Sequence, residues 1–589
     1  MKDDPCTNEA VQNERATICG DKTRIGKWNT RYWAEAVVVA IALLLWVPRL
    51  SGPIDLRWDA GVYYVLGTSL ASGHGYRILS EPGAPEALQY PPLLAAVVAL
   101  HEWALGTTNP DIVGAWLRKL YFVIFVAYAL AVLALAKRYL RPWFALAATT
   151  LCLLHLYTIF LSDLLFAELP FALVSVVFAL VAVSGPAASR QWLRETTSFV
   201  LAVAGFLLRT AGVVLFAAWL LEALIRRRWS LALARGAFAV VTIALWQARV
   251  ERVRTSDEYI RPTYEYQRAP YQYYNVAYAE NILLVDPFQP ERGLADRRAL
   301  MTRLVTNFAK MPAALGEAMS TTDQFWRRFL QRAQHRLPGR ALIPLRFVSV
   351  PIFGFAALVV AGLVVLIRRG AWFMVFIVLG SVGLTCTTPW PRQFARYLSP
   401  LAPFLTIAAV LALSRIGTVL RLPELGRVAA LGRVALASVV VLTVAVQAQA
   451  ALWLFGERAC AHGATFVPGG GSVGARFFYH DHSWRAWEEA TAWIDGHAPP
   501  DAIVATNAPH FCYLRTGRRA VLPPMESDPV RARRLLESVP VSYVIIDELK
   551  FLDISRRYAL PAVRSDPVVW QLVYSIEGTQ IYQRASSAE

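Results

Sequence analysis

The chain has 589 residues, of which 56% are hydrophobic and only 17% are charged, and its mean hydropathy is +0.40. A soluble globular protein of this length rarely combines these values, so the composition predicts a protein that crosses a membrane many times. The net charge of +17 does not indicate a nucleic-acid-binding protein, because the basic residues lie in short segments between apolar runs and not on one polar domain.

A polar tail, residues 1–32, comes first, and its basic residues directly before an apolar run predict a cytoplasmic N-terminus. The stretch 198–225 is too long for one ordinary span and has Arg209 and Gly212 at its middle, so we expect a helical hairpin there. Residues 91–106 are apolar but short, which predicts an interfacial or re-entrant segment. With the hairpin counted as two passes, about 11 spans are expected, at 33–50, 118–136, 143–161, 166–184, 198–225, 230–250, 341–367, 371–388, 398–414 and 434–455.

Short basic loops such as Arg226 to Arg228 belong in the cytoplasm under the positive-inside rule. This placement puts three polar regions on the outer side of the membrane: a first loop at 51–117, a long loop at 251–340 and a C-terminal domain at 456–589. The long loop contains a tyrosine-rich patch, Tyr259 to Tyr278, for which an interfacial aromatic belt is a better account than stacking on sugar rings. The transmembrane domain is expected at 33–455.

The C-terminal domain has the pattern of an α/β fold. An amphipathic helix is predicted around Trp484 to Ile494, strands at 503–506 and 541–547, and a closing hairpin at 568–582 that turns at Glu577 and Gly578. Cys460 and Cys512 both fall in this region, and their sequence positions leave open whether they pair. The whole chain is therefore predicted to be a mainly α, polytopic membrane protein with an α/β domain outside.

Acidic residues at the ends of apolar helices are costly and mark candidate functional sites. Asp55 and Asp59 directly follow the first span, and Asp163 and Glu168 lie at the outer end of the third. The predicted topology brings all four to the same face of the membrane. For any one of these residues alone, a functional role and a simple position at the membrane–water interface explain the sequence equally well.

Four motifs lie in order along this face. The first combines Asp59 with the elements Tyr63, Leu70, Gly73, Gly75, Tyr76 and Tyr90-Pro91-Pro92-Leu93; the others are Asp163 with Glu168, Pro170 and Phe171; Arg209-Thr210-x-Gly212; and Arg396-Tyr397-Leu398-x-Pro400 with Pro403. Together they resemble the GT-C glycosyltransferases, in particular the protein O-mannosyltransferase and aminoarabinose transferase group. The resemblance covers residues 33 to 455, and an appended outer domain is typical of bacterial members. Ala60 departs from the pattern, since many relatives have a second acid there.

The resemblance implies an enzyme of the bacterial inner membrane that transfers a sugar from a polyprenyl-phosphate donor to a lipid, glycan or protein acceptor on the outer face. An inverting transfer needs one carboxylate base, for which Asp59 is the candidate and Asp55, four residues earlier, the competitor. Arg209 and Arg396 suit the phosphate because a guanidinium stays charged and binds oxygens in pairs. Further substrate-binding candidates are Asp55, Tyr63, Tyr90, Asp163, Glu168 and Tyr397.

No cofactor is indicated by the sequence, although Asp163 leaves a divalent cation open as an alternative to a role in sugar binding or in holding Arg396. Two other classes of protein share some of these features. A polymerase or ligase of lipid-linked glycans has the same leaving group, and a transporter also has many spans with buried charges, although transporters commonly show repeated halves that this sequence lacks. The sugar, the acceptor and the length of the lipid are not encoded in any pattern that we identify.

Overall fold

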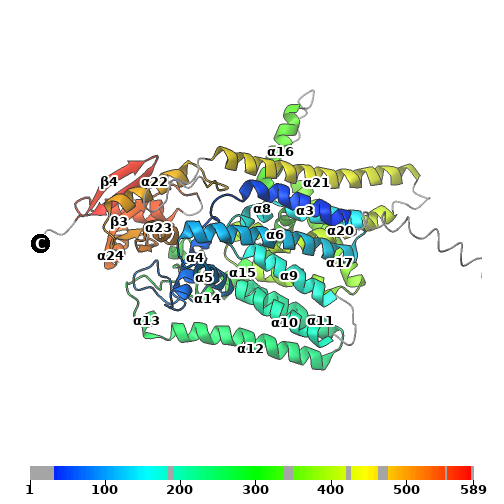
Figure 1. Cartoon of the computed structure of the whole chain (residues 1–589), viewed down its shortest axis with the longest axis horizontal. Helices are drawn as coiled ribbons and strands as arrows, with labels where there is room; N and C mark the ends of the chain where they lie inside the picture. The colour runs from blue at the N-terminus through cyan, green and yellow to red at the C-terminus, as the bar shows by residue number, and fades with distance from the viewer. Residues whose placement is uncertain are drawn as a thin grey trace, which may run out of the picture.

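The computed structural model describes residues 32–183, 191–336, 349–419, 426–461, 475–550 and 553–585. Long helices run side by side in a bundle, and a small domain with a sheet covers one end of it (Figure 1). We call this the domain end of the bundle. The predicted N-terminal tail lies outside the described residues, apart from Tyr32.

The first part of the bundle contains α3 (Trp33–Trp46), α6 (Pro110–Tyr139), α7 (Pro142–Leu154), α8 (Leu156–Ser162) and α9 (Glu168–Val183). The start of α6 follows from its sequence: Asn109 accepts hydrogen bonds from the amides of Asp111 and Ile112, and Pro110 occupies the first helical position. At its other end α6 carries Lys137, which pairs with Glu35 of α3 at 2.5 Å. Helices α7 and α8 are bent by 54° at His155.

The second part contains α10 (Gln191–Leu208), α11 (Val213–Ile225) and α12 (Trp229–Arg254), and it confirms the predicted helical hairpin. The chain turns at Arg209, whose backbone is extended, and continues through a short 3-10 turn, Thr210–Gly212. A Cβ atom at Gly212 would lie 2.4 Å from the backbone of Gly205, so only glycine allows the two arms to approach this closely.

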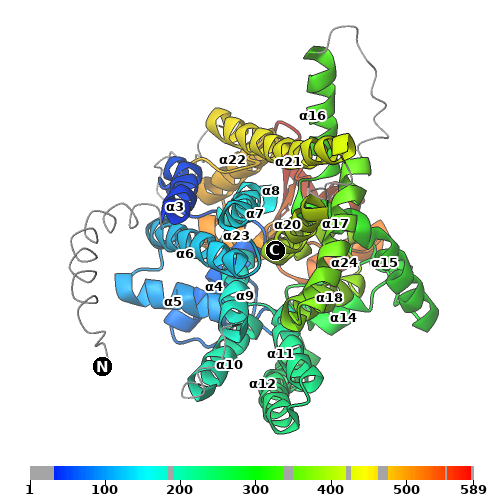
Figure 2. The same ribbon diagram turned by 90° about the vertical axis from the view of Figure 1, so that its right-hand side faces the viewer.

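The third part contains α15 (Arg297–Met319), α16 (Asp323–Arg336), α17 (Ser349–Arg368), α18 (Trp372–Cys386), α19 (Phe394–Leu398), α20 (Ala402–Val419) and α21 (Gly426–Cys460). Helices α15 and α20 both pack against α17, while α16 projects away from the bundle (Figure 2). The predicted start of the span at 341–367 lies outside the described residues up to 348. The predicted boundary between residues 455 and 456 falls within α21.

Five of the described helices are long and apolar enough to cross a membrane, or six if the bent pair α7 and α8 is one span. Several of the other predicted spans coincide with shorter apolar helices, α9, α11 and α18 among them. These helices show an integral membrane protein. The short apolar segment after Pro92 forms α5 (Leu93–Leu105), which packs against α4 (Asp59–Ala71) and leaves Trp103 77% exposed, as an interfacial helix would.

Three tyrosines of the tyrosine-rich patch, Tyr264, Tyr266 and Tyr274, are buried inside the protein, so the interpretation of the patch as an aromatic belt is wrong for these side chains. This region has only the short helices α13 (Asp257–Ile260) and α14 (Tyr278–Ile282). Tyr264 and Tyr266 pack in one apolar cluster with residues of the sheet. The hydroxyl of Tyr264 donates to Glu81 at 3.0 Å, which satisfies it inside the protein and not at a lipid headgroup.

The C-terminal domain has the predicted α/β fold. Its elements are α22 (His482–His497), β1 (Ile503–Ala505), α23 (Pro509–Thr516), β2 (Ala520–Val521), α24 (Pro529–Ser538), β3 (Val541–Ile546), α25 (Leu560–Arg564), β4 (Trp570–Ile576) and β5 (Thr579–Arg584). The sheet order is β2-β1-β3-β5-β4, parallel over the first three strands and antiparallel over the last two. The β4–β5 hairpin turns at Glu577 and Gly578, both at positive φ, as expected of a tight hairpin turn. Cys460 and Cys512 are free thiols.

Candidate active site

Two segments that are far apart in the sequence lie side by side at the domain end of the bundle. The amide of Asp55 donates to the carbonyl of Asp163, and the amide of Leu165 donates to the carbonyl of Asp55, both at 3.1 Å. This short parallel bridge aligns the starts of α4 and α9, whose first residues are Asp59 and Glu168. A carboxylate at the first turn of a helix is stabilised by the helix dipole, so both positions suit an acid.

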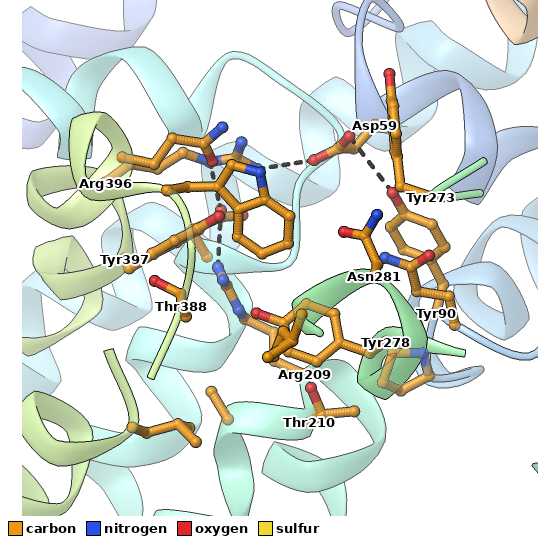
Figure 3. A pocket seen from close by; sticks show the side chains of 18 of the residues that line it. Asp59, Tyr90, Arg209, Thr210, Tyr273, Tyr278, Asn281, Thr388, Arg396 and Tyr397 are labelled. Carbon is orange, nitrogen blue, oxygen red and sulfur yellow. Dashed lines mark hydrogen bonds and ion pairs between the residues drawn. The ribbon is translucent and has the colours of Figure 1, made fainter. Parts of the chain in front are cut away.

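Asp59, Arg396, Glu168 and Arg209 form a chain of alternating charge, which we call the open chain (Figure 3). Arg396 donates from Nη2 to Asp59 Oδ2 and from Nε to Glu168 Oε1, each at 3.0 Å. Arg209 Nη1 lies 2.7 Å from the same Oε1 atom of Glu168. The side chains of Asp59 and Arg396 remain 28% and 23% exposed, so a ligand can reach them.

The open chain lines a cavity of about 910 Å³. Aromatic side chains surround it, and they include Tyr63, Tyr90, Tyr157, Phe166, Tyr273, Tyr274, Tyr278, Trp390 and Tyr397. The Arg396 guanidinium also lies over the ring of Phe166, 4.6 Å from its centre. Apolar residues from the helices, such as Phe171 of α9 and Leu384 of α18, line another part of the cavity. The cavity can therefore hold a ligand that has both apolar and negatively charged parts.

Two tyrosines of the first loop support the carboxylate of Asp59. Tyr90 points its hydroxyl at Asp59 Oδ1, at 3.4 Å (Figure 3). The ring of Tyr90 meets that of Tyr63 edge to face at 5.1 Å. Burial and the neighbouring Asp59 raise the pKa of Tyr90, and burial followed by the charge of Glu168 raises the pKa of Tyr63. Both hydroxyls therefore keep their protons at neutral pH, and that of Tyr90 acts as a donor toward the carboxylate.

Asp163 and Asp55 do not line the cavity, which differs from their expected role in substrate binding. Asp163 is buried and accepts from Arg118 at 2.7 Å, with Arg49 and Arg458 at 3.8 Å. We call these four residues the closed cluster. Three guanidinium groups around one carboxylate repel a cation, so this position does not fit a metal ion. Within the described ranges, no group of three or more His, Cys, Asp and Glu side chains has the arrangement of a metal site.

Asp55 is also buried, and its carboxylate is taken up by Arg57, whose Nη2 atom lies 2.6 Å from Asp55 Oδ2. The structure thus separates two groups of sequence candidates. Seven of them, Asp59, Tyr63, Tyr90, Glu168, Arg209, Arg396 and Tyr397, line the same cavity, while Asp55 and Asp163 lie behind it.

Several lining residues were not among the sequence candidates. Trp58, Tyr157, Asn281, Thr388 and Trp390 belong to four separate parts of the chain and follow no spacing that the sequence could reveal. The tyrosine-rich patch did carry a signal, because Tyr273, Tyr274 and Tyr278 crowd within six residues, and all three line the cavity.

Solved structures of two membrane enzymes have the same fold. The archaeal oligosaccharyltransferase AglB from Archaeoglobus fulgidus, in complex with an inhibitory peptide and a dolichol-phosphate, aligns with a TM-score of 0.51 at 12% identity, over 95% of this chain and 75% of that one. ArnT from Cupriavidus metallidurans bound to undecaprenyl phosphate aligns with a TM-score of 0.52 at 13% identity, over 94% of this chain and 98% of that one. No protein-family model and no curated protein matches the sequence. The predicted GT-C fold is therefore confirmed by structure alone.

Proposed function

We propose that this protein is a membrane glycosyltransferase that moves a sugar from a polyprenyl-phosphate donor to a hydroxyl acceptor on the outer face of the membrane, with inversion at the anomeric carbon. The open chain carries this proposal, because it puts one carboxylate and two guanidinium groups at the wall of a partly apolar cavity. The two neighbours of this fold were solved with dolichol-phosphate and with undecaprenyl phosphate, lipids that such a cavity suits.

In this proposal Arg396 and Arg209 bind the phosphate of the donor. The phosphodiester of a polyprenyl-phosphate sugar has one negative charge, and cleavage of the bond between the sugar and its phosphate adds a second. Guanidinium groups therefore stabilise the transition state more than the bound donor, which is what catalysis requires. Glu168 contacts both arginines through the same oxygen atom, Oε1, and so holds the two guanidinium groups beside each other. We assign it to positioning.

Asp59 is the proposed base. The oxygen of the acceptor hydroxyl attacks the anomeric carbon, the bond from this carbon to the phosphate oxygen breaks, and Asp59 takes the hydroxyl proton. In the structure Asp59 is paired with Arg396. A phosphate at Arg396 competes for the same Nη2 donor, so binding of the donor frees the carboxylate for the acceptor.

The aromatic side chains give the sugar and acceptor surfaces on which to pack. Tyr63, Tyr90 and Tyr397 surround the open chain from three separate elements of the fold. Membrane lipids would cover the apolar helices of the bundle. Lipid, glycan and protein acceptors all offer the hydroxyl that such a step needs, and the acceptor is the part of the proposal that experiment has to identify.

The assay that tests the proposal uses membranes containing the full chain, a panel of polyprenyl-phosphate sugars and mass spectrometry of the products. We expect turnover with at least one donor and inverted configuration in the product. The glycosyltransferase proposal would be refuted if the protein is inserted in the membrane and binds polyprenyl phosphate but forms no product with any donor.

We further propose that the protein lies in a bacterial inner membrane, with its N-terminus in the cytoplasm and its C-terminal domain outside. Accessibility tags test this orientation separately. Tags at Arg227, Arg368 and Arg427 should report the cytoplasm, and tags at Arg297 and at the C-terminus the outside. A cytoplasmic C-terminus would contradict an outer-face reaction.

A further inference from the structure

The residue directly before Asp59 has a strained backbone. Trp58 has φ 56° and ψ −136°, a conformation that is rare for any residue other than glycine and costly for a bulky aromatic one. Strain of this kind persists only where the surroundings fix the chain on both sides. Something must therefore hold the turn that carries Asp59 into α4.

The C-terminal domain and the segment that leads into it hold this turn through Arg57. The buried Arg57 guanidinium donates from Nη2 to the carbonyl of Phe478 at 2.6 Å and from Nη1 to that of Tyr479 at 3.2 Å. It lies beside two indole rings that meet edge to face, 4.5 Å from the centre of the Trp58 ring and 4.9 Å from that of Trp484. Residues separated by more than 400 positions thus fix the conformation on the N-terminal side of Asp59.

A second contact lies on the other side of Asp59. Helix α23 packs against the start of α4, where a Cβ atom at Gly61 would lie 3.2 Å from the Cβ atom of His510 and 3.4 Å from the amide of Phe511. The ring of His510 also meets that of Tyr274, which lines the cavity, at 4.4 Å. The C-terminal region therefore contacts the chain both two residues before Asp59 and two residues after it.

We propose that the C-terminal domain fixes the Asp59 carboxylate in its reactive position by clamping Arg57, which makes Arg57 a positioning residue; the effect on turnover rests on the proposed function. The domain is then a working part of the active site. Arg57 touches no lining residue other than Trp58 among its recorded contacts, so it acts through the backbone that leads to Asp59.

A comparison of Arg57→Lys with Arg518→Lys in the full chain tests the clamp. Lysine at position 57 keeps the positive charge beside Asp55 but loses the planar fork that reaches two carbonyls and packs against two rings. Arg518 is the matched control: it is also buried, and it donates to the carbonyl of Ala498 and to Asp495 inside the C-terminal domain. It has no recorded contact with the turn at Asp59.

Two measurements are needed. In hydrogen exchange, the segment from Asp55 to Leu66 should exchange at least severalfold faster in Arg57→Lys, but at the wild-type rate in Arg518→Lys. In the donor assay, Arg57→Lys should lower kcat by about 10-fold to 100-fold, as expected when a reacting group is displaced by about 1 Å, with the donor KM changed less than about twofold. A purely structural role would lower the melting temperature of both variants and leave kcat unchanged.

The outcomes separate the two proposals. Wild-type exchange of the segment in Arg57→Lys overturns the clamp, whatever the activity. Faster exchange with wild-type kcat shows a clamp that does not position the base, which overturns the positioning role. If the wild type turns over no donor, the proposed function fails, and the exchange experiment alone decides whether the domain clamps the turn.

Discussion

The closed cluster around Asp163 and the open chain around Asp59 use the same side chains for different purposes. Both lie beside the short bridge that joins Asp55 to Leu164, and both pair carboxylates with arginines. In the closed cluster the carboxylate is only 1% exposed, and Arg118 also donates to the carbonyls of Arg49 and Pro53. In the open chain two carboxylates balance two guanidinium groups, and its end residues, Asp59 and Arg209, line the cavity.

This difference teaches that burial, and not residue type, separates a structural ion pair from a candidate site. A buried pair binds elements of the bundle together, and its loss leaves an uncompensated charge in a medium of low dielectric. A partly exposed pair beside a cavity can exchange its partner for a ligand. The two groups should therefore respond to mutation in opposite ways, one in activity and the other in stability.

The largest effect is expected from Asp59→Asn, which keeps the shape of the side chain but removes the base. Turnover should fall about 100-fold to 10,000-fold, which corresponds to roughly 3 to 5 kcal/mol of barrier. The melting temperature and the binding of polyprenyl phosphate should stay close to wild type. Steady-state kinetics with the identified donor provide the measurement.

Asp257→Asn serves as the control, because Asp257 is exposed in α13 and is not among the residues that line the cavity. Asp55→Asn is the competing test. Near-normal turnover in Asp59→Asn, together with a loss in a stable Asp55→Asn, would move the base to Asp55.

The second effect is on stability. Asp163→Asn should destabilise the protein by about 3 to 5 kcal/mol, because it leaves three buried guanidinium groups without their carboxylate. The yield of inserted protein and its thermal unfolding in detergent measure this loss. Asp323→Asn breaks an exposed ion pair with Arg327 and should cost less than about 1 kcal/mol. Equal costs in the two variants would show that the closed cluster is not structural.

Arg396→Lys should give a smaller loss, about 10-fold to 100-fold in kcat/KM, in a protein that still folds. Lysine keeps the charge but cannot contact Asp59 and Glu168 through a planar fork as Arg396 does. Arg327→Lys, in the exposed ion pair of α16, is the control. Wild-type kinetics in Arg396→Lys would assign Arg396 to anchoring of its helix and remove it from the phosphate site.

The smallest effect concerns a buried group with no charged partner. Burial lowers the pKa of His510 from 6.5 to about 3, so the folded protein binds fewer protons than the unfolded chain between these values. The neutral His510 side chain therefore makes its full contribution to the free energy of unfolding above pH 6.5. This free energy falls as the pH decreases and is about 2 kcal/mol lower at pH 5. In His510→Gln the free energy of unfolding should therefore depend less on pH between pH 6.5 and about pH 3 than it does in the wild type. A curve for His510→Gln that runs parallel to that of the wild type would contradict the assignment.

The sequence by itself determined the architecture of the bundle. Apolar length sets the spans, the excess length of 198–225 together with Arg209 and Gly212 sets the hairpin, and alternation with a Glu-Gly turn sets the β4–β5 hairpin. These signals are local, because each depends on residues within one or two helices. Seven of the nine residues that the sequence offered as site candidates line one cavity, and their roles in the reaction stay predictions.

Only the tertiary structure decided which acids face the cavity. Asp55 and Asp59 are four residues apart and chemically alike, but distant residues decide their surroundings. Asp59 pairs with a residue 337 positions away, and Arg57, the partner of Asp55, is held by carbonyls more than 400 positions away. Asp163 is likewise closed off by Arg118 and Arg458, from α6 and α21. Burial depends on which distant side chains pack against a group, and the free energy of a charge depends on burial. No local pattern in the sequence contains that information.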